Sequence, residues 1–158
     1  MAKRFFSDDS FWNLPIADNA ETDPRNDDFL ERLAVEPGGP FWINCNEYAI
    51  PVYEVDDSTP RYTVHQWDLE PSRRPGRWEP RDKYWSQGPG FGKDVPIPDN
   101  AKPDPGADAH MALVDWSRNI VWDMWAARIR PDGEWESRTG MVYAADGSGV
   151  WRTDDFNV

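Results

Sequence analysis

The segment that most constrains the fold is residues 95–125, VPIPDNAKPDPGADAHMALVDWSRNIVWDMW. A proline-rich approach leads into two runs of alternating apolar side chains, separated by the short polar stretch 116–119. A period of two is typical of β-strands that bury one face, and a four-residue connection can close such strands into a hairpin. The sequence therefore predicts an antiparallel β-hairpin in which His110 faces Trp125.

This pairing separates the side chains of the hairpin into two faces. One face carries core residues, namely Met111, Leu113, Trp122 and Met124. On the other face Asp123 lies diagonally from His110 across the small Ala112, at roughly 7–8 Å between Cα atoms. A carboxylate near an imidazole can tune a general base, and Trp125 would provide a wall for stacking. We therefore expect His110 and Asp123 to be catalytic. The alternative is an ordinary hairpin with a solvated polar face, and a slip by one residue would separate the pair.

Strand candidates dominate the rest of the chain. They are residues 41–47, 49–56, 61–68, 134–144 and 149–153. A helix signal occurs once, where Asn26 or Asp27 can cap a short run with acidic residues in its first turn. The length suits one domain with an ordinary core. The sequence predicts a single all-β domain over residues 1–158, an antiparallel sandwich or barrel-like fold with one short helix near residues 27–34.

Residues 69–94 form a long stretch rich in proline and glycine, without a period of 2 or 3.6. A connection of this length is usually functional or disordered, and its aromatic content argues against disorder. Arginine pairs with carboxylates and aromatic rings stack on sugars, so this stretch would suit an anionic polysaccharide. The substrate-binding candidates, together with Trp125, are Arg73, Arg74, Arg77, Trp78, Arg81 and Trp85. Tyr84 is a third catalytic candidate. The alternative is that these arginines pair with the protein's own surplus acids.

Composition excludes several classes of function. The net charge of −12 repels phosphate backbones, which argues against duplex nucleic acid as a partner. No apolar run approaches the roughly 20 residues that cross a bilayer, so we expect no membrane insertion. The single Cys45 excludes an internal disulfide and a thiolate metal cluster. His65 and His110 are too weak a pattern to predict a metal site, and no nucleotide-binding loop is present, so no cofactor is expected.

The chain also resembles a known family in two stretches. The matching positions are Val95-Pro96-Ile97-Pro98, Ala101, Pro103, Pro105-Gly106, Asp108, His110-Met111, Val114-Asp115, and near the start Ser10-Phe11-Trp12-Asn13 with Pro15-Ile16. This pattern resembles a family of largely uncharacterised, often secreted bacterial β-rich proteins. The resemblance implies an extracellular or surface location, although the start of this chain has no signal peptide. It also implies that members continue beyond Val158, which is compatible with a longer or processed chain whose C-terminal side a partner chain completes.

These observations lead to one functional hypothesis and two alternatives. The leading hypothesis is a polysaccharide lyase or glycoside hydrolase acting on a uronate-containing glycan. In a lyase, His110 would remove the C5 proton and Tyr84 would protonate the leaving oxygen. One alternative is a non-catalytic carbohydrate-binding module. The other is a structural or assembly protein of a cell surface, filament or virion, in which the tryptophans make subunit contacts.

Overall fold

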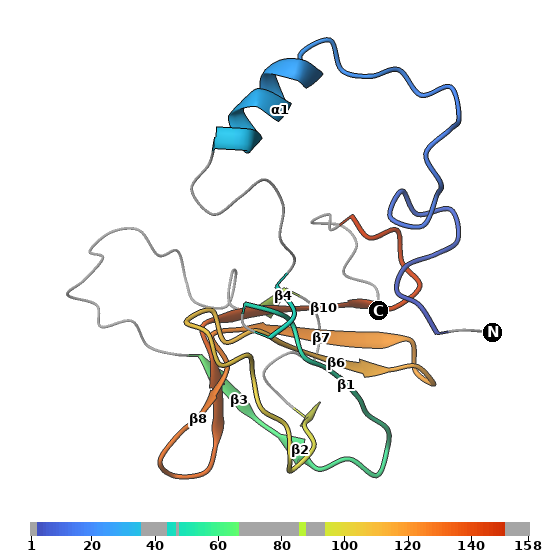
Figure 1. The fold of residues 1–158 in the computed structure, drawn as a ribbon. Coiled ribbons are helices and arrows are strands. Elements are labelled where there is room, and N and C mark those ends of the chain that lie inside the picture. Colours follow the sequence, from blue (N-terminus) through green and yellow to red (C-terminus); the bar gives the residue numbers. More distant parts are fainter. Residues whose placement is uncertain (1–2, 36–43, 47, 67–85, 88–93, 151–158) are drawn as a thin grey trace, which may run out of the picture.

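The computed structural model describes residues 3–35, 44–46, 48–66, 86–87 and 94–150 (Figure 1). The elements in chain order are α1 (Asn26–Val35), β1 (Val52–Glu54), β2 (Arg61–Tyr62), β3 (Val64–Gln66), β4 (Ser86–Gln87), β5 (Val95–Pro96), β6 (Met111–Asp115), β7 (Ile120–Trp125), β8 (Arg128–Ile129), β9 (Trp135–Ser137) and β10 (Thr139–Ala144). The prediction of a β-rich fold with one short helix is confirmed. The helix includes residues 27–34 and carries the expected acids, Asp27 and Asp28, in its first turn.

The largest sheet is mixed, with strand order β1-β6-β7-β10-β4. Its centre, β6-β7-β10, is antiparallel as expected, whereas β1 and β4 join its two edges as parallel strands. Parallel neighbours need long connections, and both edge strands are distant in sequence from the strands they join. The strand β4 lies inside residues 69–94, the stretch predicted to be irregular. It was not predicted because two residues are too few to display an alternating pattern.

The hairpin has the predicted register. Its pairs are Met111 with Met124, Ala112 with Asp123, Leu113 with Trp122, Val114 with Val121, and Asp115 with Ile120. The β6 strand begins at Met111, so His110 lies just outside the ladder. In the turn, Asn119 adopts the left-handed backbone conformation with φ 58°, which asparagine tolerates better than most residues.

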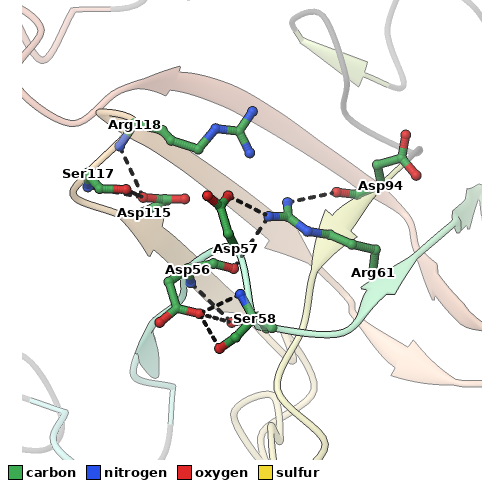
Figure 2. A network of polar contacts seen from close by, with 9 residues as sticks. Asp56, Asp57, Ser58, Arg61, Asp94, Asp115, Ser117 and Arg118 are labelled. Atoms are coloured by element: carbon green, nitrogen blue, oxygen red, sulfur yellow. Dashed lines mark hydrogen bonds and ion pairs between the residues drawn. The ribbon is translucent and has the colours of Figure 1, made fainter.

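A buried carboxylate holds the tip of the hairpin together. Asp115 Oδ1 accepts hydrogen bonds from the Ser117 backbone N–H at 3.0 Å, the Ser117 hydroxyl at 2.7 Å and the Arg118 N–H at 3.0 Å (Figure 2). The guanidinium of Arg61 lies beside this tip and contacts the Asp57 carboxylate at 3.7 Å (Figure 2). Asp115 is therefore a turn-forming residue, since its contacts are to the backbone and hydroxyl groups of the turn.

The main core lies between the large sheet and the two smaller ones, β2-β5 and β3-β9-β8. The hairpin face that was predicted to be core contributes to this cluster from the large sheet. Val64, Val95 and Trp135 contribute to it from the two small sheets. Its buried members are Val55, Val64, Val95, Ile97, Ala101, Met111, Leu113, Trp122, Met124, Ala127, Trp135 and Val142. This packing gives the described residues a two-layer, sandwich-like arrangement.

The opposite face of the large sheet is covered at one end by the N-terminal segment. Phe5 packs on Trp116 with ring centroids 5.2 Å apart, and Phe6 stacks on Tyr143 at 6.3 Å. Beneath this aromatic layer Val114 and Val121 are fully buried. The alternative of a wholly solvated second face is therefore wrong at this end, because aromatic side chains distant in sequence cover it.

The residues of the SFWN motif attach this segment to the turn after β10. The Ser10 hydroxyl donates to the Ser148 carbonyl at 2.7 Å, and Trp12 Nε1 donates to the Gly149 carbonyl at 3.1 Å. Asn13 Nδ2 donates to the carbonyls of residues 5, 6 and 7. Gly149 has φ 76°, and an added Cβ there would lie 2.4 Å from the Trp12 ring, so the close approach requires glycine. The motif has a structural role in these contacts.

The remaining strand candidates lie partly in described residues and partly outside them. The 61–68 candidate forms β2 and β3, and the 134–144 candidate forms β9 and β10. Residues 44–46 and 149–150 are not in strands, and the other residues of those two candidates lie outside the described part. The helix α1 stands apart from the sheets (Figure 1) and buries none of its residues. No helix within the described ranges has the length and apolar character to cross a membrane.

Candidate functional site

The structure places the three candidates of the hairpin near one another. Asp123 and Trp125 lie on the same face of β7, and His110 immediately precedes β6, close enough to Asp123 for its charge to act on that carboxyl. All three side chains are half-buried. Ala112, which lies opposite Asp123 in the ladder, is 5% exposed, so this position is not open to solvent. His110 and Asp123 are therefore close in space, whereas their placement on one face stays a prediction because His110 lies outside the strand.

The loop that carries His110 is tied to the end of β7 by backbone hydrogen bonds. The Ala126 N–H donates to the Asp108 carbonyl at 2.8 Å, and the Ala127 N–H donates to the Ala109 carbonyl at 3.0 Å. Ala109 has φ 42°, a left-handed conformation that alanine adopts at a cost. This loop is thus held in one conformation, and the imidazole follows it.

Asp104 is a buried carboxylate that anchors the same loop from the other side. Its Oδ1 accepts hydrogen bonds from the N–H groups of Tyr48 at 3.0 Å and Gly106 at 2.7 Å, and its Oδ2 accepts one from Ala49 at 2.9 Å. Its own N–H donates to the His110 carbonyl at 2.9 Å. Burial acts to raise the pKa of Asp104, but these backbone bonds and the charge of His110 outweigh it and hold the pKa below the ordinary value.

Asp123 has the opposite environment. Burial raises its pKa above the ordinary carboxyl value, although the charge of His110 and a backbone hydrogen bond from Met124 act to lower it. Tyr143 lies on the neighbouring strand β10, and the burial of its ring together with the negative charge of Asp123 raises its pKa to about 12. Two carboxyls with opposite pKa shifts therefore lie close enough to His110 to interact with its charge, an arrangement typical of acid–base sites.

Asp123→Asn is expected to stabilise the protein at neutral pH. Because the folded-state pKa of Asp123 is raised, the folded state holds its proton more tightly, and stability falls as pH rises above about 3.8, the ordinary value. Asparagine resembles the protonated form and avoids this loss. Thermal melts should show a higher Tm for the variant at pH 7, with the difference shrinking toward pH 3. Equal Tm values at pH 7 would contradict the burial of this charge.

Trp125 is held between a carboxylate and a cation. Its Nε1 donates to Asp108 Oδ1 at 3.3 Å, and the Arg138 guanidinium carbon lies 5.0 Å from the Trp125 ring centroid. Arg138 thus covers one face of the Trp125 indole, and the surface on which a ligand could stack is reduced to the rest of the ring. The cation–π contact places a guanidinium over the Trp125 ring, a feature that the sequence alone did not predict.

The other predicted site residues lie outside the described part of the chain. They are Arg73, Arg74, Arg77, Trp78, Arg81, Tyr84 and Trp85. Their proximity to His110 stays a prediction. Within the described ranges no group of three or more histidine, cysteine or acidic side chains could hold a metal ion.

Comparison with known proteins adds no relative. No family model, curated protein or solved structure matches this chain. The site therefore has to be interpreted from its own residues, of which Asp104, Tyr143 and Arg138 were not predicted. Tyr143 and Arg138 both lie within residues 134–144, which were predicted as a strand, and Tyr143 shares one face of β10 with Met141.

Proposed function

We propose that the face carrying His110 and Asp123 binds an anionic polysaccharide and cleaves it by proton transfer. The observation that carries the proposal is the half-buried Asp123 near His110. Burial raises the pKa of Asp123, whereas the pKa of Asp104 is lowered. A carboxyl whose pKa moves toward the working pH exchanges protons more effectively than an ordinary one. Asp104 would stabilise the imidazolium that forms when His110 accepts a proton.

In the proposed elimination each proton has a destination. His110 accepts the proton from C5 of a uronate unit, the C4–O bond breaks, and a C4–C5 double bond forms. The leaving oxygen takes a proton from the carboxyl group of Asp123, which is restored by exchange with His110 or solvent. Tyr84 stays an alternative donor, and the arginines and tryptophans of residues 73–85 would hold the polymer. A hydrolase would use the same groups with water as the attacking molecule.

The test is a panel of acidic and neutral polysaccharides with two readouts, new reducing ends and ultraviolet absorbance of unsaturated ends. We expect cleavage of a polyuronate, reduced about 10²- to 10⁴-fold in His110→Ala. The matched control is His65→Ala, because His65 lies on β3 and contacts Glu134 at 3.6 Å. If the wild type neither binds nor cleaves any polymer, the proposed function fails. If His110→Ala cleaves as well as the wild type, the catalytic assignment fails and the substrate class stands.

A second candidate, an assembly protein, is favoured by a different observation. Large apolar side chains are exposed on α1 and on the segment before it, namely Phe11, Trp12, Leu14, Ile16, Phe29, Leu30, Leu33 and Val35. Apolar surface of this extent is characteristic of interaction sites. Sedimentation over a range of concentrations separates the candidates, because self-association at low concentration favours assembly and a stable monomer favours the glycan site.

A further inference from the structure

Arg138 differs from the other unpaired cations of the described residues. Four basic side chains there form no ion pair, and three of them, Arg32, Lys102 and Arg118, are exposed. Arg138 is half-buried, and its side-chain contact is with the ring of Trp125. A partly desolvated guanidinium without a carboxylate partner is unexpected in a protein with a net charge of −12, where acidic side chains are abundant.

The position of Arg138 is determined by its neighbours. Its backbone N–H donates to the Trp125 carbonyl at 3.0 Å, and its guanidinium lies over the Trp125 ring. The ring itself is oriented by the bond from Nε1 to Asp108. A guanidinium presents its N–H donors in a rigid planar fork that matches the two oxygens of a carboxylate. Trp125 thus determines the position of the cation, whose N–H groups can donate two hydrogen bonds to one carboxylate.

We propose that Arg138 binds the carboxylate of an acidic sugar at the His110–Asp123 site and so selects an anionic polymer over a neutral one. The inference rests on the proposed function and names the residue that determines its specificity. Trp125 lies two positions after Asp123 on the same face of β7, so a sugar carboxylate on Arg138 would bring its ring next to the acid–base groups. Pairing that carboxylate with a cation also makes the adjacent C5 proton easier to remove.

Titration calorimetry with non-cleaved oligouronates tests the inference on full-length protein. A hydrogen bond to a charged group contributes about 1.5–3 kcal/mol, so Arg138→Ala should raise Kd by about 10- to 150-fold. Arg138→Lys keeps the charge and loses the planar fork, and its Kd should lie between the two. The matched control is Arg118→Ala, an exposed arginine at the far end of the same hairpin, which should bind as the wild type does.

The same oligosaccharide with its carboxyl groups reduced to alcohols distinguishes the role of Arg138 from the proposed glycan-binding function. We expect wild type and Arg138→Ala to bind the reduced form equally weakly. A neutral polysaccharide to which sulfate groups have been added shows whether Arg138 binds any anion or a carboxylate alone. If wild type and Arg138→Ala bind the oligouronate equally, the role of Arg138 is overturned while the glycan function stands. If the wild type binds neither form, the proposed function fails as well.

Discussion

Asp104→Asn is expected to lower the Tm at pH 7 by roughly 5–10 °C, a range that reflects several lost bonds in a domain of this size. The carboxylate accepts hydrogen bonds from three backbone N–H groups of two chain segments. Asparagine offers one acceptor and turns its own N–H₂ group toward the remaining donors. A buried donor left without an acceptor costs more than the missing bond is worth on average.

The pH dependence of this effect distinguishes a charge effect from a change of shape. Because the folded-state pKa of Asp104 is lowered, its stabilisation is present above the ordinary value of 3.8 and is lost as pH falls through the folded pKa. Melts from pH 3 to pH 8 should therefore show a constant difference between Asp104→Asn and wild type above about pH 5, shrinking toward pH 3. A difference that stays constant down to pH 3 would indicate that charge plays no part.

The two carboxylates near His110 thus give opposite stability signatures. Removing the charge of Asp104 is expected to destabilise the protein at neutral pH, whereas removing that of Asp123 is expected to stabilise it. A carboxyl whose charged form lowers stability is one of the features that perturbed functional groups share. The N–H of Asp104 donates to the His110 carbonyl, so Asp104 helps to fix the backbone position of His110.

Local patterns explain why the hairpin could be predicted. The register follows from the alternation in β6 and β7 and from the short turn, both of which are visible within 20 consecutive residues or fewer. The position of Asp123 opposite Ala112 follows from that register, whereas His110 lies outside the paired strand. The helix α1 was predicted for a similar reason, because its acidic first turn is a local signal, although the expected caps Asn26 and Asp27 lie inside the helix.

The features that were not predicted depend on contacts between distant segments. Asp104 acts on backbone groups of residues 48 and 49, and nothing in their side chains signals that contact. The cover over Val114 and Val121 comes from the N-terminal segment, and Arg138 follows β9 in a bend without periodicity. The parallel edge strands β1 and β4 likewise join the sheet from afar. Hydrophobic periodicity cannot report which segments meet in space.

Leu113→Ala is expected to have the largest effect on stability, a loss of about 2–5 kcal/mol in the free energy of unfolding. Leu113 is fully buried, and it lies between Tyr53 of β1 and Trp122 of β7 in the ladder. Truncation removes apolar contacts and leaves a cavity that neighbouring strands cannot fill without shifting. The control is Ile129→Ala on β8, where the side chain is 57% exposed and a change within about 0.5 kcal/mol is expected.

Urea unfolding of this variant also tests the shared core. Leu113 packs in one cluster with Val64 of β3, Val95 of β5 and Trp135 of β9, so the loss should weaken all three sheets together. We expect one transition with an unchanged m-value and a lower midpoint, since the surface exposed on unfolding is the same. Two separate transitions would show that the small sheets unfold independently. A loss below about 1 kcal/mol would show that the site collapses around the alanine, because the cost of a large-to-small substitution depends on how fully the cavity closes.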